Sequence, residues 1–282
     1  MQNFNYHTHT YRCGHADLIE DEEYIKEYIK MGFKRVAFTD HCPEKEVIDD
    51  REKIRMRYEQ RKEYLDSIKR LKEKYADKII IESGYEIEYL PGQEANLQEL
   101  KKETDKLVLG QHFIYDKNKN LRVCGRDSFT KEEIMEYASY VEKAIELGIP
   151  DIIVHPDNYI QSRGKFEEDE AKVAHRICKV AEKHGIPIEI NLAQVFNATY
   201  YKDRVLNDDS IEIQKGRLGS VPYPRKEFWQ IASNYDVKVL YGIDAHHKGQ
   251  INLFNNLVTL ANEIIGMETI SKLKFAENEI FA

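Results

Sequence analysis

Three histidines stand within nine residues of one another near the start of the chain, as His7, His9 and His15. Side chains of an extended strand repeat every two residues, so the imidazoles of His7 and His9 should point to the same side. Gly14 allows the chain to turn, which would bring His15 back toward them. The spacing therefore favours one shared metal site over a solvated terminus or an expression tag, which would be a run of histidines.

Further nitrogen and oxygen donors stand in or after short apolar runs that read as buried strands. These runs and their donors are 35–39 with Asp40 and His41, 79–88 with Glu86, 107–110 with His112, 151–154 with His155, and 237–243 with Asp244 and His246. About four to six donors suffice for one Zn²⁺, Mn²⁺ or Fe²⁺ ion, so this set predicts more than one metal. We expect His175 and His184 to lie on a helix surface, and His247 to face away from His246.

The apolar runs alternate with amphipathic helical patterns, which indicates a parallel α/β sheet. The expected strands are 4–6, 35–39, 79–88, 107–112, 151–156, 187–191 and 237–242, and the expected helices are 19–31, 51–75, 130–147, 168–184, 225–234 and 252–265. Thr130 and Glu133 form a plausible capping box. We expect a long irregular loop over 192–223 and a short extra helix in the tail 268–282.

Two architectures place a site at the carboxyl ends of parallel strands. A (β/α) barrel brings all strand ends to one mouth, whereas a doubly wound open sheet forms its site at a switch point served by only a few strands. Because the candidate ligands come from six of the seven expected strands, the barrel suits them better.

Composition bounds the class of protein. The 282 residues fit one domain spanning 1–282, and 42 Lys+Arg against 50 Asp+Glu give a net charge of −8, which argues against a nucleic-acid surface built on bulk positive charge. No long apolar run or leader is evident, so we expect a cytoplasmic protein without membrane contact. Cys13, Cys42, Cys124 and Cys178 form no C-x-x-C pair, and we expect reduced thiols.

The ordered set of motifs resembles the polymerase and histidinol phosphatase (PHP) superfamily over nearly the whole chain. The motifs are His7-Thr8-His9, His15, Thr39-Asp40-His41, Gly84-Tyr85-Glu86, Gly110-Gln111-His112, Val154-His155-Pro156 and Asp244-Ala245-His246. The stretches 6–10, 13–16, 55–57, 110–113 and 222–224 are most similar to the histidinol-phosphate phosphatase branch. This resemblance implies a distorted TIM-like (β/α)7 barrel with a trinuclear centre of Zn, Mn or Fe.

The resemblance also implies a set of ligands for each metal. The first metal would take His7, His9, Glu86 and Asp244; the second would share Glu86 and add His112 and His155; the third would take His15, His41 and His246. Asp40 could be a ligand or could orient His41. Glu88, on the same strand face, is the alternative to Glu86. For phosphate binding we expect Arg217 with Arg163 as its partner, although either could be an ordinary surface arginine.

The function implied is hydrolysis of L-histidinol phosphate, a small phosphate ester, to L-histidinol and phosphate in histidine biosynthesis. Closely spaced metals would create hydroxide from a bridging water and neutralise the phosphoryl oxygens, while Asp244 or His246 could protonate the leaving alkoxide. An alternative is a PHP phosphoesterase that acts on a nucleotide, a DNA end or a phosphotyrosyl protein. A metal-free regulatory scaffold fits less well, because every ligand position is filled.

Overall fold

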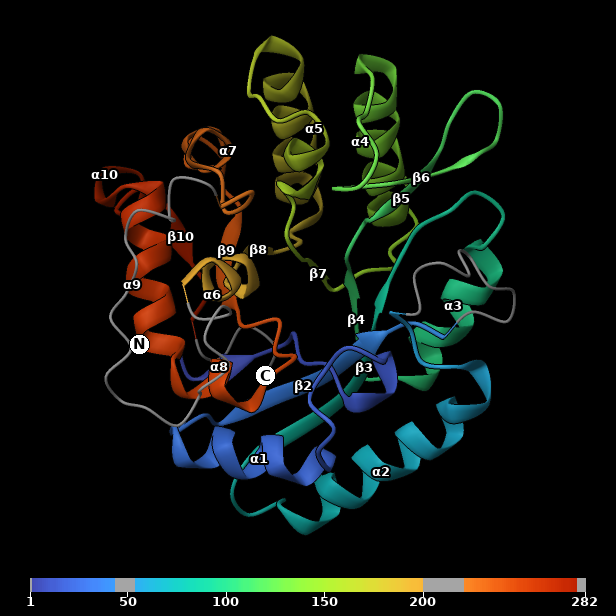
Figure 1. Cartoon of the computed structure of the whole chain (residues 1–282), viewed down its shortest axis with the longest axis vertical. Helices are drawn as coiled ribbons and strands as arrows, with labels where there is room; N and C mark the ends of the chain where they lie inside the picture. Colours follow the sequence, from blue (N-terminus) through green and yellow to red (C-terminus); the bar gives the residue numbers. More distant parts are fainter. Residues whose placement is uncertain (1, 44–53, 200–220, 278–282) are drawn as a thin grey trace.

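The computed structural model describes residues 2–43, 54–199 and 221–277 (Figure 1). One sheet of eight strands, all paired in parallel, forms its centre. In spatial order the strands are β1 (Phe4–Asn5), β2 (Arg35–His41), β3 (Ile80–Ile87), β4 (Lys106–Leu109), β7 (Ile152–Ile153), β8 (Ile188–Asn191), β9 (Lys238–Gly242) and β10 (Lys274–Phe275). The first seven of these correspond to the seven predicted strands, so the predicted parallel α/β fold is confirmed.

The sheet curves back on itself at its carboxyl end. An isolated parallel bridge joins Thr8, just after β1, to Ala245, just after β9. The backbone N–H of His9 donates to the Ala245 carbonyl at 2.9 Å, and the Ala245 N–H donates to the His7 carbonyl at 3.2 Å. This bridge brings the first and last candidate ligands of the chain to the same rim of the sheet.

Helices surround the curved sheet (Figure 1). They are α1 (Asp21–Lys30), α2 (Arg61–Lys74), α3 (Glu94–Glu103), α4 (Lys131–Glu146), α5 (Glu168–His184), α6 (Ala193–Thr199), α7 (Lys226–Ala232), α8 (Lys248–Asn252), α9 (Phe254–Ile265) and α10 (Met267–Ile270). The predicted capping box opens α4, where the Thr130 side chain accepts from the Glu133 N–H and the Glu133 side chain accepts from the Thr130 N–H. None of the helices in the described ranges has both the length and the apolar character that a membrane span requires.

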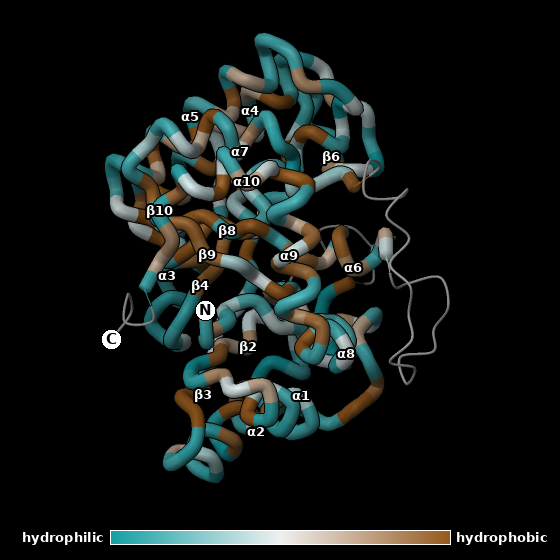
Figure 2. The backbone as a smooth tube through the Cα atoms, turned by 90° about the vertical axis from the view of Figure 1, so that its left-hand side faces the viewer, coloured by the Kyte–Doolittle hydropathy of each residue, from teal (hydrophilic) through white to brown (hydrophobic). Residues whose placement is uncertain are grey.

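Two apolar clusters hold the fold together. The larger packs the outer face of the sheet against the helices, and Figure 2 shows its hydrophobic segments concentrated along the central strands, with hydrophilic segments on outer helices such as α4 and α5. The smaller consists of Phe4, Tyr6, Ala37, Val108, Ile152, Val154 and Leu240. Its members come from several strands of one sheet and alternate with residues of the larger cluster, so it fills the interior of the curved sheet.

Helix α3 was not predicted, and several other differences from the predicted elements have local causes. The helix predicted over 51–75 begins only at Arg61, after a 3₁₀ turn at Tyr58–Gln60, and residues 51–53 lie outside the described part. The chain before it is not helical, and here Arg55 donates to Glu88 at 2.9 Å and stacks on Phe113, so tertiary contacts override helix propensity.

The tail holds α10 and then strand β10, rather than a helix alone, because β9 would otherwise present an open edge. The fourth strand ends at Leu109, so His112 lies between strands, just before a hairpin of β5 (Phe113–Tyr115) and β6 (Leu121–Val123) that the sequence did not predict. The loop predicted over 192–223 begins with helix α6, and its residues 200–220 lie outside the described part.

Candidate metal centre

The segment after β1 places the first histidines. His7 and His9 are fully buried and their ring centroids are 5.1 Å apart, as the two-residue strand period predicts. Gly14 adopts a φ of +82°, a conformation that few other residues tolerate, and turns the chain after a 3₁₀ turn at Tyr11–Cys13. The His15 ring consequently lies 6.4 Å from that of His9 and 4.3 Å from that of His246.

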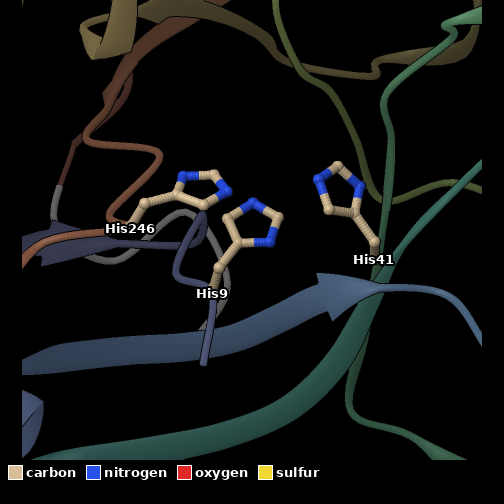
Figure 3. Close-up of side chains that lie close together, drawn as sticks. All are labelled: His9, His41 and His246. Carbon is tan, nitrogen blue, oxygen red and sulfur yellow. The ribbon is translucent and has the colours of Figure 1, made fainter. Parts of the chain in front are cut away.

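Histidines from opposite ends of the sheet meet in the centre. Figure 3 shows His9 and His246 side by side, with His41 facing them from the end of β2. The ring centroids of His9 and His246 are 4.0 Å apart, and those of His9 and His41 are 4.4 Å apart. The ring nitrogens of these three residues are close enough together to bind one ion.

Glu86, at the end of β3, lies between the histidines. Its Oε1 is 2.8 Å from His155 Nε2, and its Oε2 is 2.8 Å from His41 Nδ1. His7, His9 and His112 present Nε2 atoms to it at 3.5–3.8 Å. Gly110 makes room for this carboxylate, because a Cβ at Gly110 would overlap Glu86 Oε1.

Asp244 closes the cluster from the segment after β9. Its Oδ1 lies 3.1 Å from His9 Nε2 and 3.5 Å from His7 Nε2. Asp244 has a φ of +51° and His155 a φ of +33°, so two of the three non-glycine residues with positive φ among those described are candidate ligands. Strained backbone of this kind persists only where the surrounding structure enforces it, and it is concentrated at functional sites.

Many buried polar atoms of this cluster lack an aligned hydrogen bond within the described residues, although some lie beside a neighbour of opposite character, as Glu86 Oε2 does beside His41 Nδ1 at 2.8 Å. These atoms are His7 Nε2, His9 Nε2, His41 Nδ1, His155 Nδ1, His246 Nε2, Glu86 Oε2 and Asp244 Oδ1. Leaving one such atom unsatisfied costs about 1–3 kcal/mol, so a concentration of them requires an explanation. Several of these nitrogens and oxygens lie within 4.8 Å of one another, which is the arrangement that a divalent metal ion would satisfy.

The protonation states agree with this interpretation. Burial alone would raise the pKa of Glu86, but His41 and His7 outweigh it and hold that pKa well below its ordinary value, so Glu86 is ionised. His15 keeps an exposed surface at the mouth, but the crowded cluster removes water from its ring and, with His246 and His9, lowers the pKa of His15 to about 4, which keeps its imidazole in the neutral form that binds metal.

His9 titrates in the opposite direction. Burial would lower its pKa, but hydrogen bonds to Asp244 and Asp40 outweigh it and raise that pKa to about 9. The carboxylates around His9 thus favour a positive charge, and a metal ion could supply that charge in place of the proton.

A cavity of about 530 Å³ opens onto the cluster. Its floor includes six cluster residues: His15, His41, Glu86, His112, His155 and His246, with Asp244 beside them. Neutral polar side chains form its wall: Asn158, Gln161, Gln194, Asn197 and Tyr223. Among the described residues no lysine or arginine lines it. The candidate ligands and the cavity therefore share one mouth.

Sequence and structure comparisons agree on the family. A family profile described as PHP domain matches residues 5–193. The chain belongs to the PHP family. A probable histidinol-phosphatase of Deinococcus radiodurans is 24% identical over 87% of this chain and 86% of its own length. A histidinol-phosphatase of Bacillus subtilis is 26% identical over 52% of this chain and 57% of its own length.

Two solved structures share the PHP fold. The putative histidinol phosphatase of Listeria monocytogenes matches with a TM-score of 0.69 and 22% identity, covering 88% of this chain and 97% of that one. The histidinol phosphate phosphatase of Lactococcus lactis, solved in complex with Zn, L-histidinol and phosphate, matches with a TM-score of 0.61 and 16% identity, covering 92% and 94%. The divalent-metal chemistry expected of this chain agrees with the clusters of donor atoms in its own mouth.

Most residues predicted for the site of this PHP chain are brought together. Asp40 is adjacent, but it faces His9 rather than the His41 ring: its Oδ1 lies 3.4 Å from His9 Nδ1 and accepts from the His41 N–H at 2.9 Å. Glu88 lies behind the cluster, where it accepts from His112 Nδ1 at 2.8 Å. His247, expected to face away, lines the cavity and donates from Nδ1 to Asp17 at 2.8 Å.

The predicted phosphate-binding arginines are not part of this assembly. Arg163 donates to Glu170 at 2.7 Å and to the Phe129 carbonyl at 2.9 Å, and it does not line the cavity. Arg217 lies outside the described residues. Of the two helical histidines, His175 contacts Tyr235 through its Nδ1 on the exposed side of α5, as a surface role predicts.

Sequence reasoning missed two residues of strand β8. Glu189 and Asn191 are two residues apart, so both side chains point inward to the mouth, and both are buried. The available signal was a charged residue within an otherwise apolar strand, 187–191, because a carboxylate is almost never fully buried without a partner.

Proposed function

We propose that this PHP protein is a metal-dependent phosphomonoesterase that hydrolyses L-histidinol phosphate to L-histidinol and phosphate in histidine biosynthesis. The observation that carries the proposal is the set of buried, unpartnered nitrogen and oxygen atoms that converge at the mouth of the curved sheet. The similarity to histidinol-phosphatases, together with the zinc, L-histidinol and phosphate bound in the Lactococcus structure, supports this choice of substrate.

The proposed centre holds three divalent ions, of Zn, Mn or Fe. We assign His7, His9, Glu86 and Asp244 to the first; Glu86, His112 and His155 to the second; and His15, His41 and His246 to the third. The closeness of His7, His9 and Asp244 supports the first assignment, and that of Glu86 and His155 supports the second. For the third, His246 has neighbouring donors in both His41 and His15.

Bound ions would activate water and neutralise the phosphoryl oxygens. The residues of the chain would then orient the ester: the amide side chains of Asn158, Gln161 and Gln194, with the Tyr223 hydroxyl, offer donors and acceptors along the cavity wall. Among the described residues no arginine or lysine lines the cavity, so there the ions would meet the phosphate charge, while Arg217 stays the proposed phosphate ligand outside the described part.

Two residues are candidates to protonate the leaving alkoxide. His246 Nδ1 lies 3.1 Å from the Asp244 carbonyl, so an ion on its Nε2 would leave it no nitrogen directed at the substrate. Asp244 lines the cavity and approaches His7 and His9 only through Oδ1. Asp244 is therefore the better placed of the two. Burial would raise its pKa, but His7 and His246 hold that pKa well below its ordinary value, so Asp244 would first accept a proton, such as the one released by the activated water.

The test is phosphate release from L-histidinol phosphate by the purified protein, before and after a chelator and after Mn²⁺ or Zn²⁺ is restored. We expect turnover that is lost on chelation and regained with metal. If the metal-loaded protein cleaves p-nitrophenyl phosphate but leaves histidinol phosphate intact, the proposed substrate is wrong, whereas the assignment as a metal-dependent phosphomonoesterase stands.

A further inference from the structure

Strand β8 supplies none of the proposed ligands, yet it carries a buried carboxylate at the metal centre. Glu189 is 1% exposed, and its two oxygens lie 3.2 and 3.0 Å from Nδ1 of His7. The opposite nitrogen of that ring, Nε2, is one of the unpartnered atoms directed at Glu86 and Asp244. Glu189 therefore contacts the far side of a candidate ligand and not the ion position itself.

Asn191 holds this carboxylate in place. Its Nδ2 donates to Glu189 at 2.7 Å and to Oδ2 of Asp244 at 3.2 Å. Its own Oδ1 accepts from the Ala193 N–H at 2.9 Å, so the orientation of the amide is determined by its partners. Glu189 and Asn191 thus form one unit, the β8 pair, that touches both His7 and Asp244.

The adjacent strand leaves space for the β8 pair. Gly242 on β9 is the register partner of Asn191, and a Cβ at Gly242 would overlap the Glu189 carboxylate. The backbone N–H of His155 lies 3.4 Å from the same carboxylate, on its other side. The pocket for the Glu189 side chain is therefore built by neighbours on two strands.

We propose that Glu189 is the positioning residue for the first metal ion, the one assigned to His7, His9 and Asp244. By accepting from His7 Nδ1–H it selects the tautomer whose Nε2 lone pair faces the ion, and its charge makes that nitrogen a stronger donor. This inference rests on the metal centre of the proposed function. It adds a residue that does not itself bind metal.

A second carboxylate has the same relation to a different histidine. Glu88 accepts from Nδ1 of His112 at 2.8 Å and from its N–H at 2.6 Å, but Glu88 also pairs with Arg55. Among the described residues no lysine or arginine forms an ion pair with Glu189. The negative charge of Glu189 is therefore directed mainly at His7, whereas Arg55 offsets part of that of Glu88.

The experiment measures metal binding rather than turnover. The full chain and its Glu189→Gln variant are equilibrated with Zn²⁺ in chelator buffers of graded strength, and bound zinc per chain is determined by elemental analysis. Glutamine keeps the shape but not the charge, so we expect one equivalent to bind about 10–100-fold more weakly and the others as in the wild type. Glu82→Gln, a buried carboxylate away from the cluster, is the matched control and should bind zinc like the wild type.

Two double variants identify which ion is affected. His9→Asn already weakens the binding of the first zinc ion, so adding Glu189→Gln to it should weaken the binding of no further zinc ion. His112→Asn weakens the binding of the second zinc ion, so adding Glu189→Gln to that variant should weaken one more. Excess zinc should restore the hydrolytic rate of Glu189→Gln, and urea unfolding without zinc should match that of the wild type, which separates a binding defect from a folding defect. Asn191→Ala, which leaves His7 and Glu189 intact, should show the same selective loss to a smaller degree.

Unchanged binding of every equivalent in Glu189→Gln, or equal weakening of all of them, would overturn the positioning role. These outcomes are separate from the fate of the proposed function. A wild-type protein that binds zinc as described but spares histidinol phosphate would contradict the substrate alone.

Discussion

The interior of the curved sheet has two ends that treat buried charge in opposite ways. At the amino end of the strands, Glu82 lies between Arg35 at 3.3 Å and Lys106 at 3.5 Å. Together with the smaller apolar cluster that fills the sheet interior and includes Ile152 and Leu240, this end is called the plug below. At the carboxyl end, two carboxylates face a group of histidines whose buried nitrogens lack partners. The first end pairs its carboxylate with two cations of the chain, although Glu82 Oε2 itself lacks a hydrogen bond among the described residues. The second end has the donors for cations and no lysine or arginine at the described cavity to replace them.

The two ends of the sheet interior therefore serve different purposes: the amino end bears mainly on the stability of the fold, and the carboxyl end on metal binding. The charges at the amino end are paired within the chain and need nothing from outside it, but the mouth reaches its full stability only when something outside the chain is bound. We therefore expect changes at the mouth to alter metal binding and turnover, and changes at the plug to alter unfolding. The following measurements test that division.

Removing the metal should have the largest effect. Ions present at 100 times their dissociation constant would stabilise the protein by about 2.7 kcal/mol per site, and their removal would also abolish turnover. Thermal unfolding and phosphate release, followed before chelation, after it and after Mn²⁺ is returned, measure both. If the chelated protein unfolds at the same temperature as the metal-loaded one, bound cations do not stabilise the mouth, and the difference between the two ends is contradicted.

A cavity in the plug should act on stability alone. Ile152 is fully buried in the interior cluster, so Ile152→Ala should lower the free energy of unfolding by about 2–5 kcal/mol. Urea denaturation gives this value, and zinc content per folded chain should match that of the wild type. Loss of zinc from the folded variant would show that the two ends are coupled.

Two glycines on neighbouring strands offer a paired comparison. A Cβ at Gly110 would strike the flexible Glu86 side chain, whereas a Cβ at Gly84 would strike the backbone carbonyl of Lys106. Gly110→Ala should displace a ligand and weaken zinc binding by about 10–100-fold. Gly84→Ala should chiefly lower the unfolding temperature. If Gly84→Ala instead weakens zinc binding and Gly110→Ala lowers only the unfolding temperature, the proposed separation of stability from metal binding is wrong.

The smallest effect concerns pH at the plug. Burial raises the pKa of Glu82 above its usual value, and Lys106 and Arg35 oppose this only in part. The folded state then binds a proton more readily than the unfolded state, so this group loses stabilisation as the pH rises above the ordinary glutamate value. Relative to wild type, Glu82→Gln should gain stability over that rise. Urea titrations at pH 4 and pH 7 compare the two proteins, and an opposite trend would show that the two cations dominate.

The sequence allowed the strands and most of the centre to be predicted, because both rest on short-range patterns. His7 and His9 share a face by strand period alone, and Thr130 with Glu133 marks a helix start without tertiary information. The start of α2 was predicted too early, because contacts of Arg55 with Glu88 and Phe113 override propensity there.

The remaining features depend on contacts distant in sequence. Glu189 carries no motif, and its role is visible only when strand β8 is placed beside His7. Arg163 was expected at phosphate, but a charged partner on α5, Glu170, lies closer to it. Strand pairing at β10 similarly depends on the open edge of β9, which no local pattern at Lys274 reveals.

The bridge between Thr8 and Ala245 has a consequence for biosynthesis on the ribosome. His9 leaves the exit tunnel early and His246 late. In the folded protein their rings nevertheless stack with centroids 4.0 Å apart, and the bridge joins the residues that precede them, Thr8 and Ala245. The centre thus cannot be completed co-translationally until almost all of the described chain has emerged, because its contacts join residues that are far apart in the sequence. Nascent chains would carry the early histidines exposed while the segment up to His246 is made, and full metal loading is expected only after that segment has emerged.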